Sequence, residues 1–299
     1  MHKTKPTGDA LRAARECGAA AAVSAGLQRD LRECQAAYPG LFPARPFDST
    51  LFSAVAQANA FGAMWASTDR LRVASRTALW IFALDWLLDY VATSREEVDH
   101  LVRGCLDVAD GSPPPPDFLL GRFLAEIQEE LATAPAFAGF EPVWREELRR
   151  MLSAMAREWD WKTAAREGRP LPTLDEYLAN ADNFGSSFVN VSHWIRGGDL
   201  AALGHFDELR AASGQVQRVL RLLNDLATYE RDLAWGDLNA LMLCSGREEI
   251  AGRVDVLVDG CGELLEPLRD VCPDEVVYLE RQIGYSMGFY GITDYWGGL

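Results

Sequence analysis

The sequence lacks any uninterrupted apolar run of the ~20 residues that a membrane-spanning helix needs. Residues 1–16 are polar and charged, which argues against a cleavable signal peptide. The six cysteines are scattered, with neither a CxxC pair nor nearby histidine ligands. We therefore expect a cytoplasmic protein with free thiols and no membrane span.

Basic residues are scarce: 29 Lys and Arg stand against 44 Asp and Glu, which gives a formal net charge of −15. An acidic surface repels nucleic acid and anionic membranes, so neither is expected as a partner. A small anionic ligand is compatible with this charge, provided that metal ions supply the positive charge.

Strand signals are almost missing. Alternating apolar and polar residues are rare, no Asn-Gly or Asp-Gly turn joins two β-branched runs, and no repeat of fixed period indicates a solenoid. Long stretches instead follow the helical period, at residues 51–66, 73–92, 95–109, 117–133, 141–164, 174–195, 206–235 and 261–290. About ten helices with short connections predict an all-α bundle.

Proline and glycine mark the connections between these stretches. The proline run at 113–116 is interpreted as an exposed loop, because neither side of it looks able to fold alone. Thr173, with Glu176 three residues later, has the capping-box pattern that starts a helix. We expect a single domain over residues 1–299, of which residues 1–45 are partly flexible.

Two aspartates interrupt the otherwise apolar stretch "ALWIFALDWLLDYVA" at residues 78–92. Asp85 and Asp89 are four residues apart, so a helix places both on one face. A buried carboxylate is costly unless something pairs with it. Either this face is a solvent stripe, or the two carboxylates hold a cation.

A second polar row lies in "RVLRLLNDLATYERDLAWGDLNALML" at residues 218–243. Asn224, Thr228 and Asp232 recur every four residues and drift only ~40° around a helix at each step. Their side chains offer the oxygen ligands that Mg²⁺ prefers. Each row alone is compatible with a solvated face, but the two together predict one metal site. Because Mg²⁺ usually shares its shell with phosphate oxygens and water, the implied ligand is a diphosphate.

These motifs resemble those of class I terpene synthases, whose DDxxD and NDxx(S/T)xxx(D/E) motifs bind three Mg²⁺ and the substrate diphosphate. "LDWLLD" (84–89) matches the first motif, with Trp86 in place of its second aspartate, and "NDLATYERD" (224–232) matches the second in full. The resemblance implies an α-helical bundle around a central, aromatic-lined cavity. Its implied metal ligands are Asp85, Asp89, Asn224, Thr228 and Asp232, and its implied catalytic residues are Asp85, Asp89 and the diphosphate-contacting Arg231.

The resemblance can be narrowed to the kaurene synthase-like enzymes that act on labdane diphosphates, on the strength of "EYLANA" and the 221–243 stretch. Two departures concern diphosphate sensing. The arginine that other bacterial members carry after "EYL" is replaced by Asn180 or Ala181, and Asp294 stands where their C-terminal arginine–tyrosine pair has its arginine. The stretch from 157 to 181 also resembles the segment that leads into a kinked helix, which predicts a kink near 183–188.

The expected activity is a Mg²⁺-dependent diterpene synthase that ionises a C20 allylic diphosphate of copalyl type. Acyclic geranylgeranyl or farnesyl diphosphate is the alternative substrate. The sequence has no DxDD motif for protonation-initiated cyclisation, so a bicyclic substrate would come from an upstream class II cyclase. The partners considered are therefore the isoprenoid diphosphate, that cyclase and a second copy of the chain in a homodimer.

A carbocation needs a dry cavity, and aromatic faces stabilise cations. For any single aromatic residue, ordinary core packing is the competing interpretation. No side-chain nucleophile is required, so His193 and His205 are interpreted as ordinary helix residues. The expected substrate-binding residues are Trp80, Phe82, Trp86, Phe184, Ser187, Phe188, Tyr285, Phe289 and Trp296.

Two other functions fit parts of the pattern. A prenyl-chain elongase resembles this fold but carries two DDxxD motifs, whereas the second row here is Asn, Thr and Asp. A non-catalytic all-α scaffold would use both rows as solvated or salt-bridged faces.

Overall fold

The computed structural model describes residues 8–197 and 200–297. The all-α prediction is confirmed, because these residues are 78% helical and include no strand. The α-helices are α1 (Gly8–Ala37), α2 (Ser49–Gly62), α3 (Thr68–Trp86), α4 (Arg95–Ala109), α5 (Leu119–Ala132), α6 (Phe137–Arg166), α7 (Leu174–Ala179), α8 (Ser186–Gly197), α9 (Leu200–Leu203), α10 (Phe206–Trp235), α11 (Arg247–Leu265) and α12 (Pro273–Tyr290). Between them lie a π-helix, η1 (Leu87–Val91), and the 3₁₀ segments η2 (Ala181–Phe184), η3 (Ala240–Met242) and η4 (Glu266–Leu268).

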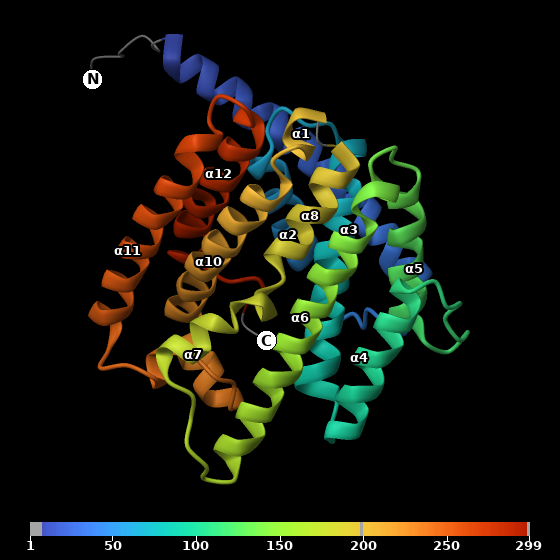
Figure 1. The fold of residues 1–299 in the computed structure, drawn as a ribbon, viewed down its shortest axis with the longest axis vertical. Helices are drawn as coiled ribbons and strands as arrows, with labels where there is room; N and C mark the ends of the chain where they lie inside the picture. Colours follow the sequence, from blue (N-terminus) through green and yellow to red (C-terminus); the bar gives the residue numbers. More distant parts are fainter. Residues whose placement is uncertain (1–7, 198–199, 298–299) are drawn as a thin grey trace.

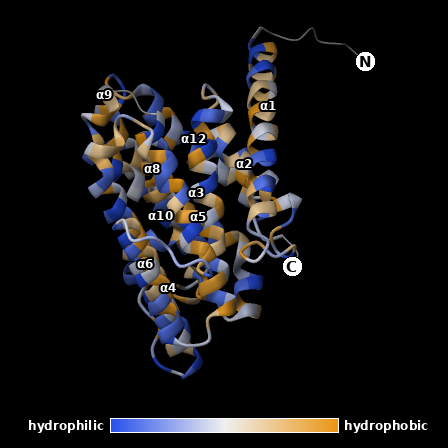
Figure 2. Ribbon diagram, turned by 90° about the vertical axis from the view of Figure 1, so that its right-hand side faces the viewer, coloured by the Kyte–Doolittle hydropathy of each residue, from blue (hydrophilic) through white to orange (hydrophobic). Residues whose placement is uncertain are grey.

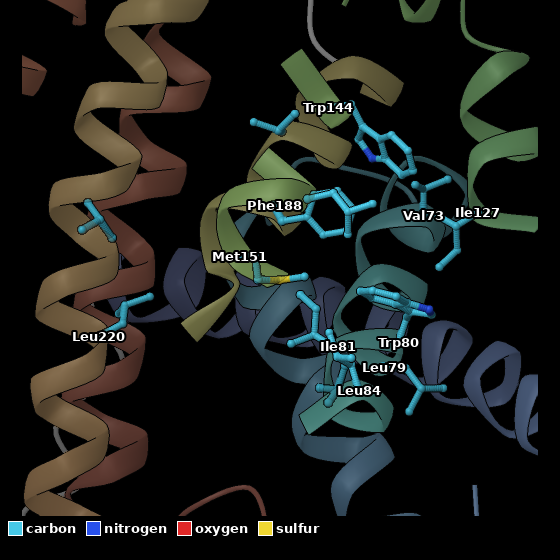
Figure 3. Packing of buried hydrophobic residues seen from close by; sticks show 14 of the residues in the cluster. Val73, Leu79, Trp80, Ile81, Leu84, Ile127, Trp144, Met151, Phe188 and Leu220 are labelled. Atoms are coloured by element: carbon cyan, nitrogen blue, oxygen red, sulfur yellow. The ribbon is translucent and has the colours of Figure 1, made fainter. Parts of the chain in front are cut away.

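The bundle is arranged around α3, α8 and α10, with α6 and α12 beside them (Figure 1). Its core is rich in large aromatic side chains. Phe188 of α8 lies between Trp80 of α3 and Trp144 of α6, at ring centroid distances of 6.2 and 5.2 Å (Figure 3). Burial of such side chains is the main stabilising contribution to a helical bundle, because the helices alone are marginal in water.

Helix α1 was not predicted. Its residues 8–19 are exposed, and the start of the helix stands clear of its neighbours along one side of the molecule (Figure 2). The apolar stripe that docks it begins only at Ala20 and continues through Leu27 and Leu31, so the first half of the helix carries no burial signal. The predicted flexibility of residues 1–45 stays a prediction, and residues 1–7 lie outside the described part of the chain.

The predicted helix breaks mostly agree with the structure. Thr173 and Glu176 form the predicted capping box of α7. The predicted kink near 183–188 is present, because Gly185 adopts a left-handed conformation (φ 77°) between η2 and α8. The single helix predicted at 261–290 is wrong. It divides at η4 because Pro273, like Pro267, has no backbone N–H to continue a helix, and Pro273 starts α12 instead.

Three long helices end at the same end of the bundle. The η1 segment after α3, the last turns of α6 and the turn after α10 come together where Lys162 contacts Asp89 and Asp237 (Figure 1). Helix C-termini carry partial negative charge, so this end of the bundle favours cations even without the carboxylates.

Among the helices within 8–197 and 200–297, none combines the length and apolar character that would let it cross a membrane.

Candidate active site

A cavity of about 260 Å³ lies within the bundle. Its lining comes from α2, α3, η1, α6, η2, α8, α10, α12 and the segments that follow α10 and α12. Asp85, Asp89, Asn224 and Asp232, which come from the two predicted rows, all line this one cavity.

The first row changes helix type at its centre. Asp85 is in the last turn of α3, and Asp89 is in η1, where the amide of Ala92 donates to the carbonyl of Leu87 at 2.8 Å, as in a π-helix. Burial raises the pKa of Asp85 well above its usual value, and the nearby charge of Asp89 raises it further. Burial also raises the pKa of Asp89, although the Lys162 ammonium opposes this effect. Such a pair of crowded carboxyl groups would be relieved by a divalent cation.

The second row is held in place by hydrogen bonds from its surroundings. Thr228 does not line the cavity, but its Oγ1 lies 2.6 Å from Oδ2 of Asp232, to which it donates. The Nδ2 of Asn239 donates to the same oxygen at 2.9 Å. The side chain of Asn224 lies beside the hydroxyl of Tyr290. Both of the donors to Asp232 bond its Oδ2, so its Oδ1 is the oxygen that could bind a metal ion.

Arg231 also lines the cavity, but it is engaged by carboxylates. It forms an ion pair with Asp294, lies 3.5 Å from Asp232 Oδ1, and packs over the ring of Trp235 at 5.1 Å. Its Nε is buried without a hydrogen-bond partner. Asp294 in turn accepts hydrogen bonds from the amides of Trp296 and Gly297, so Arg231 fastens the segment after α12 to α10.

Sequence reasoning missed a second arginine at the cavity. Arg221 lines it from one turn before Asn224, and only 9% of the residue is exposed. Its Nη2 bonds Glu158 Oε1 at 2.5 Å, and its Nε donates to the hydroxyl of Tyr177 at 2.6 Å. The i−3 spacing from Asn224, which puts both residues on one helix face, was the available signal.

The aromatic predictions divide into two groups. Phe82, Phe184, Tyr285 and Trp296 line the cavity. Trp86 and Phe289 stand behind this wall, where Trp86 stacks on Tyr90 at 4.7 Å and Phe289 stacks on Tyr285 at 5.7 Å.

Trp80, Ser187 and Phe188, predicted to contact the substrate, lie in the core instead. Trp80 is fully buried and donates from Nε1 to the carbonyl of Leu120 at 2.9 Å, while Ser187 Oγ bonds Ser213 Oγ at 3.0 Å. Helix geometry explains the error. The cavity face of α3 is Ala78, Ile81, Phe82 and Asp85, at the spacing of one helical stripe, and residue 80 is off that stripe.

The donor set fits a hard divalent metal that is completed by other ligands. Within the described residues, no three Asp, Glu, His or Cys side chains converge into a metal cage. Mg²⁺ rarely needs one, since it is usually bound by one or two carboxylates together with water and substrate phosphate oxygens. The two rows offer carboxylate and amide oxygens to one cavity, which suits ions shared with a diphosphate.

Comparisons with known proteins agree with this geometry. Residues 76–254 match the profile of terpene synthase family 2, C-terminal metal binding. The chain is 26% identical over 272 residues to ent-pimara-9(11),15-diene synthase of Streptomyces sp. (strain KO-3988), covering 90% of both chains.

Solved structures share the fold. An a-eudesmol synthase has a TM-score of 0.69 at 18% identity, with 90% of this chain and 95% of that chain covered. The 2-methylisoborneol synthase of Streptomyces coelicolor A3(2), solved with Mg²⁺ and 2-fluoroneryl diphosphate, has a TM-score of 0.69 at 17% identity, with 90% of both chains covered. The match to the terpene synthase family, by contrast, shows that the scaffold interpretation is wrong. Because the family match spans more than half of the sequence, the chain belongs to terpene synthase family 2 and is a class I terpene synthase, a lyase that acts on prenyl diphosphates.

Proposed function

We propose that the protein is a Mg²⁺-dependent diterpene synthase that ionises a C20 allylic diphosphate of copalyl type and releases diphosphate. The observation that carries this proposal is the meeting of two oxygen-donor rows at one cavity that Phe82, Phe184, Tyr285 and Trp296 also line. The C20 substrate class is supported by the 26% identity to a diterpene synthase over nine-tenths of the chain. A bicyclic substrate would be supplied by a separate class II cyclase.

In this proposal Asp85 and Asp89 hold metal ions from one side, and Asn224, Thr228 and Asp232 hold them from the other. Three bound Mg²⁺ would supply the positive charge that stabilises the leaving diphosphate. Thr228 would coordinate through a hydroxyl lone pair while its O–H still donates to Asp232. Arg221 and Arg231 direct guanidinium groups toward the same end and bind diphosphate oxygens.

The remaining cavity residues exclude water and shape the carbocation. Phe82, Phe184, Tyr285 and Trp296 present rings, whose faces attract a cation by about 1 kcal/mol or more when water is excluded. The ion pair between Arg231 and Asp294 keeps Trp296 over the cavity by anchoring its backbone amide.

The test is incubation of the purified protein with Mg²⁺ and each candidate diphosphate: copalyl-type, geranylgeranyl and farnesyl. Terpene products are identified by mass spectrometry, and released diphosphate is measured in parallel. A product from the copalyl-type substrate alone supports the full proposal. A product from an acyclic substrate alone would instead identify a synthase that acts directly on geranylgeranyl or farnesyl diphosphate. Consumption of isopentenyl diphosphate with chain lengthening would identify an elongase.

A further inference from the structure

Lys162 is the only lysine of the chain after Lys5, and every other basic side chain of this region that carries a full charge is an arginine. It lies near the C-terminal end of α6 and is 4% exposed. Burying an ammonium group is costly unless it is paired. The presence of a single buried lysine, in a region where the other basic side chains are arginines, therefore needs a physical explanation.

The partners of Lys162 come from three separate segments. Its Nζ lies 3.4 Å from Oδ1 of Asp89 and 3.4 Å from the carbonyl oxygen of the same residue, both in η1. It also forms an ion pair with Asp237, in the turn after α10, and lies 5.6 Å from the ring of Tyr90. The hydroxyl of Tyr90 donates to Asp237 at 3.1 Å, which closes the group.

The turn that carries Asp237 is built for this contact. Gly236 takes a left-handed conformation (φ 73°), and the amide of Asp237 donates to the carbonyl of Asp232 at 2.8 Å. This tight reversal holds Asp237 at the cavity only five residues after the proposed metal ligand Asp232. Lys162 therefore links the end of one ligand row to the end of the other.

Asp89 is shared between this group and the cavity. Its side chain is 30% exposed and lines the cavity, while one carboxylate oxygen faces the ammonium. Within the part of the chain that the structure describes, Lys162 is the one basic side chain within ion-pair distance of Asp89. A compact ammonium is the protein side chain closest to a metal ion in size and charge density.

We propose that Lys162 is a resident counterion of the first ligand row: it keeps Asp89 and Asp237 in place without metal and lowers the affinity of this row for free Mg²⁺. The inference rests on the proposed function, because it requires Asp89 to be a metal ligand. A divalent ion that binds beside an ammonium is repelled by it, and the negative charge of the diphosphate offsets that repulsion. Lys162 thereby couples tight metal binding to the arrival of substrate, and it acts as a positioning residue.

Thermal unfolding in a Mg²⁺ titration without substrate separates this role from a purely structural one. We expect Lys162→Gln to lower Tm by about 2–6 °C in metal-free buffer, since it removes the ammonium partner of two half-buried carboxylates in a chain of this size. Mg²⁺ should restore most of this loss, with a half-saturating concentration about tenfold below that of the wild type, as removal of one adjacent unit charge predicts. Lys162→Arg, which keeps the charge, should titrate like the wild type.

A matched control removes a comparable ion pair away from the cavity. Arg76 is half-buried and bonds Asp30 at 2.6 Å and Glu130 at 3.2 Å, so Arg76→Gln should lower Tm without any gain from Mg²⁺. If Lys162→Gln does not fold, the same comparison is made in an Asp237→Asn background. The double variant Lys162→Gln/Asp237→Asn, which loses one charge of each sign, is then compared with Asp237→Asn alone. In that background the lysine substitution should again lower the half-saturating Mg²⁺ concentration.

A Mg²⁺ response of Lys162→Gln equal to that of the wild type, in both backgrounds, would overturn the inference. Failure of the proposed function looks different. In that case the wild type itself would show no protection by Mg²⁺ with pyrophosphate, whereas a protected wild type with an unchanged lysine variant rejects the counterion role alone.

Discussion

Asp232 is the residue at which the metal interpretation and the structural interpretation give the most different predictions. Asp232 is 8% exposed, and its carboxylate accepts hydrogen bonds from Thr228 and Asn239, which are 2% and 0% exposed. Asp232→Ala removes one acceptor from each donor, at a cost of about 1 kcal/mol each, because Thr228 can still donate to the carbonyl of Asn224 and Asn239 to that of Asp225, both at 2.9 Å. Removal of a carboxylate whose pKa is raised by burial offsets part of that cost. We therefore expect a net loss near 1–2 kcal/mol, or a Tm lower by about 2–6 °C.

The effect on catalysis should be far larger. Loss of a charged metal ligand removes several kcal/mol of leaving-group stabilisation, and each 1.4 kcal/mol is about tenfold in rate, so Asp232→Ala should slow ionisation roughly a thousandfold or more. Asp232→Asn is the matched control, because its amide oxygen still accepts from Thr228 and Asn239 while the charge is gone. It should keep a Tm close to that of the wild type and lose most of the activity.

The assay is single-turnover release of diphosphate, with Tm measured in parallel with and without Mg²⁺ and pyrophosphate. Asp232→Glu keeps the charge and matches the residue that the resembled motif more often carries, so we expect measurable activity with the same product class. Wild-type turnover in Asp232→Ala, or unfolding of Asp232→Asn at ordinary temperature, would refute the assignment of this carboxylate as a metal ligand.

The remaining predictions concern the wall, the kink and the core. Phe82→Ala and Trp80→Ala are a matched pair on one helix: the first should change the product profile in mass spectrometry, and the second should cost about 3–5 kcal/mol in denaturant unfolding with the profile of the surviving enzyme unchanged. Gly185→Ala should lower Tm, because a Cβ there would lie 2.9 Å from Ile81 and 3.0 Å from Met151 at a φ of 77°, and an unchanged Tm would contradict the strain. Burial lowers the pKa of His193 from 6.5 to about 4, so the unfolded state binds the extra proton and stability should fall by up to about 3 kcal/mol as the pH drops from about 6.5 to 4. His193→Gln should flatten that part of the stability–pH curve, and an unchanged slope would exclude His193 as its source.

The shared face of each polar row could be predicted, because one row lies within α10 and the other runs from α3 directly into η1. Spacing alone puts Asp85 with Asp89 and Asn224 with Asp232, and the π-helical turn at η1 still leaves both aspartates at the cavity. The aromatic wall could be predicted only in part. Trp80 was predicted to line the cavity because it is aromatic. Since Asp85 faces the cavity, helical spacing places Ala78, Ile81 and Phe82 on the same face and leaves Trp80 off it.

Contacts between distant segments were beyond prediction from the sequence. Lys162 is 73 residues from Asp89 and 75 from Asp237, and its role depends on α3, α6 and α10 ending at the same level. The pair of Arg231 with Asp294 is of the same kind. Asp294 reads in the sequence only as a departure from an expected arginine, and the structure gives it a partner 63 residues away.

The charges that line the cavity give a physical reason for the proposed role of metal ions in binding an anionic substrate. Six acidic residues line it, namely Asp85, Asp89, Glu158, Asp225, Asp232 and Asp237, against two arginines among the described residues. Both arginines are already paired, Arg221 with Glu158 and Arg231 with Asp294. A diphosphate that entered alone would therefore meet net negative charge in a site of low dielectric, where repulsion is several times stronger than in water. Divalent ions reverse the sign of that field, so metal and substrate binding are coupled by the electrostatics of the site itself.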